Sequence, residues 1–435
     1  MSDSRPVSAL RCVACAASFR IEEALTACPA CGDLLDVVHD FGAFGRTGAG
    51  WRDLFDRRRA ALPTAGTPAH EVSGVWRYRE LVFPALAEGE IVSKPEGNTG
   101  LYPGRGLGEE IGLPRLFVKH EGENPTLSFK DRGMTVGVSW AKHLGITHVA
   151  CASTGDTSAA MAAYAAEVPG MTGVVLVPDE KITGEQLSQA LHYGARTLAL
   201  ETDFDGCMRV VAELSAKHPL YLLNSKNAVR IEGQKTIGQE AIHDLGWEVP
   251  DWFVVPVGNA GNVSALGKGL REWLDLGILG KRPRIAGVQA EAADPFYRSF
   301  LGGFRERVTR TAGETAASAI RIGAPVSHVK ARREIGAFDG VVERVTEEEL
   351  LSAFALANRH GLAICPNSAV ALAGAKKLRA SGVIRREDLV VVIATAHALK
   401  FSGPALAWHA SGRPGANPVR KVQATVEAVA GALGL

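Results

Sequence analysis

Short apolar runs alternate with longer amphipathic segments along most of the chain after residue 110. The apolar runs predict strands at Leu116–Lys119, His148–Ala152, Val174–Val177, Thr197–Leu200, Leu220–Leu223, Trp252–Val257, Ile285–Gln289 and Leu389–Ala394. The segments between and after them repeat apolar residues every three or four positions. These periods predict helices at Met134–Leu144, Ser158–Glu167, Thr183–Tyr193, Gly206–Lys217, Arg230–Leu245, Val263–Leu276, Glu347–His360 and Ser368–Ala380. Strands that alternate with helices predict an α/β fold of open parallel sheets flanked by helices on both faces.

The two ends of the chain have patterns of their own. Residues 1–45 lack the strand–helix alternation and are expected to form a separate small module. At the other end, a connection rich in glycine and proline, Ser411 to Pro418, precedes an amphipathic period at Val422–Leu433. This period predicts a helix that closes on the body of the protein.

Four of the seven cysteines lie in the N-terminal module. Two Cys-x2-Cys pairs, Cys12 with Cys15 and Cys28 with Cys31, are separated by twelve residues. Four thiolates at this spacing are typical of a tetrahedral zinc site in a module too small to fold without metal. The pattern predicts a zinc-ribbon-like module at residues 1–45; the alternative is a ribbon that keeps its cysteines but binds no metal. In either case its role is structural, because a closed four-thiolate site has no open position for a substrate.

Composition and charge exclude several classes of function. The chain has 435 residues with 48 Lys+Arg against 47 Asp+Glu, so its net charge of +1 gives no footprint for nucleic acid. No apolar run approaches the roughly 20 residues that cross a bilayer, and the N-terminus lacks the apolar core of a signal peptide. We expect a cytoplasmic enzyme that binds neither membrane nor nucleic acid. The remaining cysteines, Cys151, Cys207 and Cys365, are expected to be buried thiols.

Lys130 is the most informative residue of the chain. It lies in Glu123-Asn-Pro-Thr-Leu-Ser-Phe-Lys-Asp-Arg-Gly133, where a polar loop becomes the helical period that follows. A lysine gains nothing from the dipole at a helix start, which favours anions. An amine held there is instead suited to forming a Schiff base with a carbonyl cofactor. For this segment taken alone, a solvated lysine in a first helical turn is the simpler interpretation.

Further polar segments occur where predicted strands give way to helices, the positions at which open α/β sheets collect ligands. Ala152-Ser-Thr-Gly-Asp-Thr-Ser158 offers hydroxyls and backbone N–H groups to a carboxylate or phosphate, or caps the next helix. Val257-Gly-Asn-Ala-Gly-Asn262 can fold into a phosphate-binding nest, or into a tight turn. Thr395, after the last predicted strand, can share a hydrogen bond with a heteroaromatic nitrogen. His397 and Lys400 follow it; each can face the same site, but a structural role is the expectation for both.

An amine, a phosphate nest and a hydroxyl at a strand end are what pyridoxal 5'-phosphate requires. With these motifs the chain resembles the threonine synthase family, in particular its plant-type branch, within the tryptophan-synthase-β-like or fold type II enzymes. The resemblance extends over nearly the whole chain. It is carried by Glu96–Thr99, Ser128–Asp131, Ser153–Ser158, Thr202–Met208, Asn224–Ser225, Arg230–Lys235, Gly258–Asn262, Ala317–Gly323, Thr395–Phe401 and the cysteine segment Cys12–Cys31.

The resemblance implies a role for the residues of these motifs. Lys130 would carry the cofactor as a Schiff base and act as general base and acid. The cofactor phosphate would be held by Gly258, Asn259, Ala260, Gly261 and Asn262. Thr395 would face the pyridine nitrogen of the cofactor, and Asp156 would lie near its phenolic oxygen. The substrate carboxylate would be bound by Ser153, Thr154, Thr157 and Ser158, and the substrate phosphate by Ser225 and Arg230 with help from Ser153 and Thr157.

The implied reaction is the conversion of O-phosphohomoserine and water to L-threonine and phosphate. The implied architecture has two open parallel-sheet domains, a large one at residues 46–133 and 227–435 and a small mobile one at 134–226. A homodimer is common among such enzymes and is expected here. Regulation by S-adenosylmethionine, a property of the plant-type branch, does not follow from the sequence.

Two departures from the family pattern bear on the substrate. Leu127 replaces the usual glycine of the lysine motif, and Gly100 replaces the usual proline after Glu96–Thr99. A bulky Leu127 is expected to narrow the pocket or redirect the loop that carries Lys130. In addition, Asp156 stands where many relatives in the wider fold have asparagine, which brings a charge close to the cofactor.

Other functions remain as alternatives. A related pyridoxal phosphate enzyme acting on another phosphorylated amino acid, such as cysteate synthase, would use the same phosphate-binding residues. A threonine or serine dehydratase fits less well, because its substrate needs no phosphate clamp. A non-catalytic ligand-binding homologue would have no reason to keep Lys130, the phosphate nest and Thr395 together. A zinc-ribbon nucleic-acid binder conflicts with the balanced charge.

Overall fold

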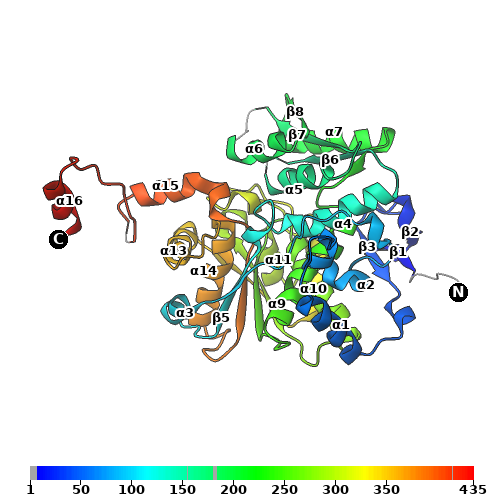
Figure 1. Ribbon diagram of the computed structural model, residues 1–435, viewed down its shortest axis with the longest axis horizontal. Helices are drawn as coiled ribbons and strands as arrows, with labels where there is room; N and C mark the ends of the chain where they lie inside the picture. Colours follow the sequence, from blue (N-terminus) through cyan, green and yellow to red (C-terminus); the bar gives the residue numbers. More distant parts are fainter. Residues whose placement is uncertain (1–6, 154, 180–183, 414) are drawn as a thin grey trace.

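The computed structural model describes residues 7–153, 155–179, 184–413 and 415–435. They form two mainly parallel sheets with their helices and a small N-terminal sheet (Figure 1). The larger sheet has the strand order β12 (Val341–Val345), β11 (Arg284–Ala290), β10 (Trp252–Pro256), β13 (Val390–Ala394), β5 (Leu116–His120) and β4 (Leu101–Pro103). These strands pair in parallel except for β4, which is antiparallel to β5.

The smaller sheet lies beside the larger one, at the top of Figure 1. Its parallel strands have the order β8 (Arg196–Leu200), β7 (Thr172–Pro178), β6 (His148–Ala152) and β9 (Tyr221–Leu222). Each apolar run that predicted a strand forms one, with ends shifted by at most two residues. The predicted class of parallel sheets flanked by helices is therefore confirmed.

The helices of the structure include one at each predicted period and others, such as Gly48–Ala60 and His328–Ala337, that were not predicted. They are α1 (Gly48–Ala60), α2 (Arg79–Val82), α3 (Arg105–Ile111), α4 (Lys130–His143), α5 (Asp156–Ala165), α6 (Gly184–His192), α7 (Phe204–Lys217), α8 (Val229–Gln234), α9 (Thr236–Asp244), α10 (Gly261–Asp275), α11 (Pro295–Leu301), α12 (His328–Ala337), α13 (Glu347–Arg359), α14 (Pro366–Ala380), α15 (Ser402–Ala410) and α16 (Val426–Leu433). The period predicted at Arg230–Leu245 divides into α8 and α9 at Lys235. Within the described ranges, none of these helices combines the length and apolar character that crossing a membrane requires.

The core of the larger sheet is built from strands buried on both faces. Every residue of β10 and β13 is buried, as expected for central parallel strands with helices on both sides. Strands β4 and β12 were not predicted from the sequence. Both lie at edges of the sheet, where β4 has only three residues and the apolar run of β12 is interrupted by the charged pair Glu343 and Arg344.

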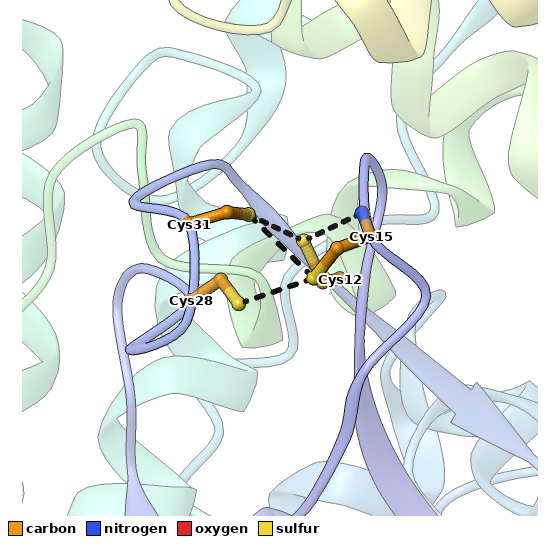
Figure 2. Close-up of side chains that lie close together, drawn as sticks. All are labelled: Cys12, Cys15, Cys28 and Cys31. Carbon is orange, nitrogen blue, oxygen red and sulfur yellow. Dashed lines mark hydrogen bonds between the residues drawn. The ribbon is translucent and has the colours of Figure 1, made fainter.

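The N-terminal module is a small antiparallel sheet. Strand β1 (Ser8–Cys12) pairs with β2 (Ser18–Arg20) on one side and with β3 (Leu35–His39) on the other. The four cysteine sulfurs gather at one end of this sheet, all within 4.8 Å of one another (Figure 2). None of these four thiols is in a disulfide.

Strand β3 joins this module to the body through buried charges. Lys330 of α12 donates to the carbonyl of Leu35 at 2.6 Å, and Lys268 of α10 donates to the carbonyl of Val37 at 2.6 Å. His39 lies 3.2 Å from Glu232 of α8. The module is therefore fixed to α8, α10 and α12 of the body.

The C-terminal helix differs from its prediction. A helix forms within the predicted range, as α16, but none of its side chains is buried. Its apolar residues remain open to solvent, with Val426 80% exposed and Leu433 67% exposed. Figure 1 shows the segment reaching away from the body beyond α15. The expectation that this helix closes on the body is wrong, because none of its apolar side chains is buried against the core.

Candidate functional site

A cavity of about 490 Å³ opens where the strands of both sheets end. Ser153 follows β6, Asn224 follows β9, Gly258 follows β10 and Thr395 follows β13, so the carboxyl ends of strands from two sheets meet around one space. The cavity wall includes most of the residues predicted from the sequence: Lys130, Ser153, Asp156, Thr157, Ser225, Arg230, Gly258, Asn259, Ala260, Gly261, Asn262 and Thr395.

Lys130 is the first residue of α4, as its position in the sequence predicted. Its amine lies over the ring of Phe129, 4.2 Å from the centroid. Burial lowers the pKa of this amine to about 7, and the positive charge of Arg230 acts in the same direction, whereas Asp156 opposes them. Close to neutral pH the amine is therefore partly unprotonated, the form that attacks a carbonyl group and accepts a proton.

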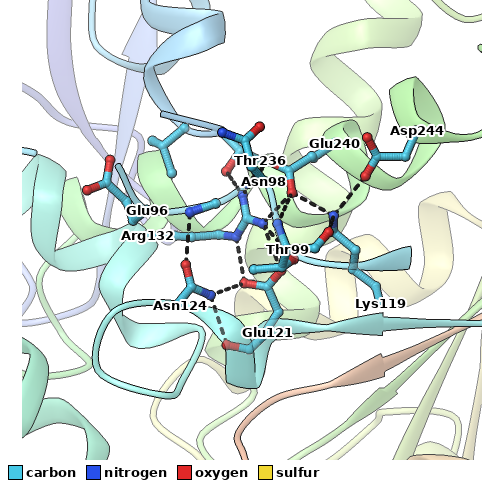
Figure 3. Close-up of polar contacts among 12 residues, drawn as sticks. Glu96, Asn98, Thr99, Lys119, Glu121, Asn124, Arg132, Thr236, Glu240 and Asp244 are labelled. Carbon is cyan, nitrogen blue, oxygen red and sulfur yellow. Dashed lines mark hydrogen bonds and ion pairs between the residues drawn. The ribbon is translucent and has the colours of Figure 1, made fainter. Parts of the chain in front are cut away.

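Helix α4 is held in place by a buried ionic network two residues after the lysine (Figure 3). The guanidinium of Arg132 forms a two-pronged ion pair with Glu121, at 2.6 and 2.7 Å, and also pairs with Glu240 at 2.8 Å. Glu240 accepts in turn from Lys119 at 2.6 Å and from the backbone of Thr99 at 3.2 Å. The motif Glu96–Thr99 thus belongs to the support of the lysine helix, because its backbone completes this network.

Asp156 begins helix α5 at the opposite wall of the cavity. Its carboxylate pairs with Lys400 at 2.9 Å, so the charge that the sequence placed near the cofactor has a buried partner. Ser153 and Thr157 also line the cavity. Ser158 does not: its hydroxyl donates to the Gly155 carbonyl at 2.7 Å and is used within the helix start. Thr154 lies outside the described residues.

The predicted phosphate nest is the turn that leads from β10 into α10. Ala260 adopts a left-handed conformation with φ +61° and precedes the first residue of α10, Gly261. Backbone N–H groups at such a turn and helix start are suited to an anion. Gly258 is required for close approach, because a Cβ there would lie 2.9 Å from Cα of Ile320. The side-chain nitrogen of Asn262 is buried without a hydrogen-bond partner, a donor still available to a ligand.

Arg230 supplies a buried positive charge to the cavity wall. Its side chain is buried, one nitrogen donates to the Leu223 carbonyl at 3.0 Å, and its Nε has no partner. Among the residues that the structure describes, no carboxylate forms an ion pair with it. Burial lowers the pKa of Arg230 to about 10, which leaves it charged at neutral pH. A buried, unpaired guanidinium is costly unless an anion binds to it.

Thr395 lies at the carboxyl end of β13 and is fixed through its backbone. Its N–H donates to the hydroxyl of Ser368 at 2.8 Å, and its carbonyl accepts from the N–H of Phe129 at 2.9 Å. The second bond joins the end of β13 directly to the residue before Lys130. The threonine hydroxyl and the lysine amine therefore face one cavity from segments that are hydrogen-bonded to each other.

Several cavity residues were not predicted as site residues. They are Phe129, Asn224, Asn227, Gln234, Asn367 and the loop Ser318–Ile322, which includes Arg321. The motif Ala317–Gly323 was noted for its resemblance to the family, and this was the only signal that pointed to the loop. By contrast, Leu127 is absent from the cavity wall. The expectation that it narrows the pocket is not supported.

The residues around the cavity fit pyridoxal phosphate. An amine of lowered pKa is available to its aldehyde, and an N–H-rich turn at a helix start is available to its phosphate. A hydroxyl lies at a strand end, and buried donors without partners occur at Arg230 and Asn262. Each of the principal groups of the cofactor thus has a chemically matched neighbour.

Comparisons with known proteins agree with this chemistry. Residues 92–396 match the family model described as pyridoxal-phosphate dependent enzyme. The chain is 41% identical over 405 residues to the threonine synthase of Methanocaldococcus jannaschii, covering 93% of this chain and 95% of that protein. It is 44% identical to the chloroplastic threonine synthase 2 of Arabidopsis thaliana, covering 87% of this chain and 74% of that protein. A solved structure of threonine deaminase isoform 2 from Solanum lycopersicum has the same fold, with a TM-score of 0.63 at 20% identity over 78% of this chain and 93% of that one.

Proposed function

Because this chain belongs to the family of pyridoxal-phosphate dependent enzymes, we propose that it acts as a threonine synthase. It would convert O-phosphohomoserine and water to L-threonine and phosphate. The observation that carries the substrate class is Arg230, a buried guanidinium without a carboxylate partner in the described cavity wall, beside the amine of Lys130. A guanidinium matches the geometry of a phosphate, and the unpaired charge favours a phosphorylated amino acid over an uncharged one.

Each wall of the cavity has its own task in this proposal. When bound, pyridoxal phosphate withdraws electrons from the carbon atoms next to the substrate amino group. The amine of Lys130, with its pKa near 7, takes a proton from the α-carbon and moves protons at the β-carbon. Ser153 and Thr157, at the start of α5, bind the carboxylate, while Arg230 and Ser225 hold the phosphate until it leaves. Thr395 offers a neutral hydroxyl to the ring nitrogen, and Gly258–Asn262 hold the cofactor phosphate.

The construction of the cavity from two sheets supports a proposal about its closure. We propose that residues 134–226, which carry the smaller sheet, form the mobile domain, and that residues 46–133 and 227–435 form the large one. Movement of the smaller sheet toward the larger one would exclude water while protons are transferred. Water then enters to add at the β-carbon.

A paired substrate assay tests the function. We expect the cofactor-loaded protein to release phosphate from O-phosphohomoserine and to form threonine. Arg230→Met should lower kcat/KM by at least about 100-fold, because a charge-assisted contact to the phosphate is lost. Arg298→Met is the control for loss of an arginine outside the cavity, since its partner Asp294 keeps Arg310 and Arg344. Phosphate release from O-phosphoserine but not from O-phosphohomoserine would instead favour an activity of the cysteate synthase kind.

We also propose that the N-terminal cysteines bind one structural zinc ion. Tetrahedral coordination with Zn–S bonds of about 2.3 Å places the sulfurs about 3.8 Å apart. The Sγ atoms of Cys12 and Cys31 are 3.4 Å apart, those of Cys15 and Cys28 3.7 Å, and those of Cys15 and Cys31 3.6 Å (Figure 2). The donor set and its spacing therefore fit zinc. The homodimer and the cytoplasmic location expected from the sequence stay predictions.

A further inference from the structure

Lys400 forms a buried contact set that the proposed mechanism does not use. Its ammonium lies 2.9 Å from the carboxylate of Asp156, donates to the Thr126 carbonyl at 2.9 Å, and donates to the side-chain oxygen of Gln189 at 2.8 Å. An ammonium has three donors, and each one here has an acceptor. Only 5% of the side chain is exposed, so water contributes little to holding the charge.

The three acceptors come from different parts of the fold. Thr126 belongs to the loop that leads to Lys130, Asp156 begins α5, and Gln189 lies in α6. Both helices flank the smaller sheet, whereas Lys400 lies in the short 3-10 helix that follows β13 of the larger sheet. One side chain therefore connects the lysine loop and the larger sheet to two helices of the smaller sheet.

Asp156 is also one of the charges that act on the Lys130 amine. Burial and Arg230 lower the pKa of this amine, and Asp156 acts in the opposite direction. The influence of Asp156 depends on where its carboxylate is held and on the positive charge paired with it. Lys400 supplies that positive charge, because it is the ion-pair partner of the Asp156 carboxylate.

We propose that Lys400 is a positioning residue for the reactive amine: it fixes Asp156 at the cavity wall and, through Thr126 and Gln189, joins the lysine loop to the helices of the smaller sheet. This inference rests on the proposed function in taking Lys130 as the cofactor-bearing amine. Besides Lys130, Asp156 and Lys400, the ionisable groups that act on this cluster are Arg230 of α8, Asp131 of α4 and Cys365 before α14.

The proposal predicts a shift in the titration of the cofactor-loaded enzyme. Removing the positive charge that is paired with Asp156 leaves its carboxylate without an ion-pair partner, and an unpaired negative charge favours protonation of the Lys130 amine. The pH midpoint of the visible absorbance change is therefore expected to rise in Lys400→Met and in Lys400→Gln. We expect a rise of at least about half a pH unit, or about threefold in proton affinity. Lys400→Gln keeps a hydrogen-bonding side chain and serves if the methionine variant does not fold.

Lys330→Met is the matched control. Lys330 is also a buried lysine with one carboxylate partner, Asp36 at 2.8 Å, and one carbonyl partner, Leu35 at 2.6 Å, but it lies against the N-terminal module. The Lys330→Met variant should be less stable than the wild type, but the pH midpoint of its visible absorbance change should stay the same. An equal shift in Lys330→Met, or no shift in either Lys400 variant, overturns the positioning role.

A second background tests whether Lys400 acts through Asp156. In an Asp156→Asn protein, Lys400→Gln should shift the midpoint by less than half of its effect in the wild type. If Lys400→Gln shifts the midpoint as much in the Asp156→Asn protein as in the wild type, Lys400 does not act through Asp156. A wild-type protein that shows no visible band after incubation with the cofactor contradicts the proposed function instead, so the two failures are distinguishable.

Discussion

The α-carbon of Gly233 in α8 lies directly against the carbonyl oxygen of Arg132 in α4, and a Cβ at this position would overlap that oxygen. Gly133 makes the reciprocal approach, since a Cβ there would lie 2.9 Å from the carbonyl oxygen of Arg230. Helix α4 begins with Lys130, and α8 carries Arg230. The close packing of two backbones therefore sets the distance between the amine and the guanidinium of the cavity.

Gly233→Ala tests this helix contact. The added methyl group must push the two helices apart, and overpacking of this kind typically costs about 1–3 kcal/mol. We expect the free energy of unfolding to fall by about 2 kcal/mol or more and kcat/KM to fall with it. Gly336→Ala in α12 is the control, because no atom lies within 4 Å of its Cβ position. Equal stability of the two variants would contradict the interpretation.

Leu127 has a left-handed backbone, with φ +64°, at a position where the family resemblance leads us to expect glycine. A leucine held there is strained by about 1–2 kcal/mol. Leu127→Gly should therefore raise the free energy of unfolding by up to about 1 kcal/mol, the remainder being lost to the flexibility of glycine in the unfolded chain. Because Leu127 does not line the cavity, kcat/KM should change by less than about twofold.

Leu127→Ala separates the backbone from the side chain. It removes most of the leucine but keeps a β-carbon in the strained conformation, so it should be no more stable than the wild type. Chemical denaturation of both variants provides the comparison. A changed preference between phosphorylated substrates in Leu127→Gly would contradict this interpretation. It would instead support the expectation from the sequence that Leu127 shapes the pocket.

The lowered pKa of Lys130 makes the stability of the cofactor-free protein depend on pH. The amine has a pKa of about 7 in the folded protein against an ordinary value of 10.5, so between these values the unfolded chain binds more protons. Stability must therefore rise with pH across this window, and the cost of burying the charge is fully present below about pH 7. Lys130→Met removes that cost. Its gain in the free energy of unfolding should be largest below pH 7 and should vanish as the pH approaches 10.5.

Urea unfolding of cofactor-free wild type and Lys130→Met over this pH range measures the effect. A constant difference at every pH would show that the variant acts through packing alone. The same variant should have no visible absorbance band with the cofactor. A band that persists would place the cofactor-bearing amine elsewhere.

Local pattern was sufficient for the central strands of the two parallel sheets and for the loops that carry the predicted cavity residues. Parallel strands are buried on both faces and therefore appear as continuous apolar runs such as Trp252–Val257, and the loops that follow them must meet at one edge. The position of Lys130 at a helix start could likewise be inferred from the change of period at Met134. These features depend on neighbouring residues in the sequence.

Features that depend on distant contacts could not be predicted in this way. Ser158 was expected to bind substrate, but whether a hydroxyl faces a ligand or its own helix start is decided by the orientation of α5. The ion pair between Asp156 and Lys400 joins residues 244 positions apart, and neither neighbourhood signals it. The amphipathic pattern of α16 predicts a helix correctly, yet it does not specify what the apolar face contacts.

The N-terminal module shares its core with the body, and this leads to a prediction about metal. Leu10, Ile21, Leu35 and Val37 belong to the same buried apolar cluster as residues of α4 and α10. A ribbon that lost its zinc would expose part of this cluster. We expect about one zinc per chain in the purified protein, and chelation should lower the Tm of the whole protein by several degrees.

Cys31→Ser should reproduce the effect of chelation and abolish zinc binding, because the exposed Cys31 completes the four-sulfur set. Cys207→Ser, in the apolar cluster beside the smaller sheet, is the control: it removes a thiol without touching the ribbon and should keep the metal. Metal analysis and thermal denaturation of the full chain distinguish the two variants. A zinc-free wild type with an unchanged Tm after chelation would instead favour the alternative of a ribbon that folds on its contacts with α8, α10 and α12 alone.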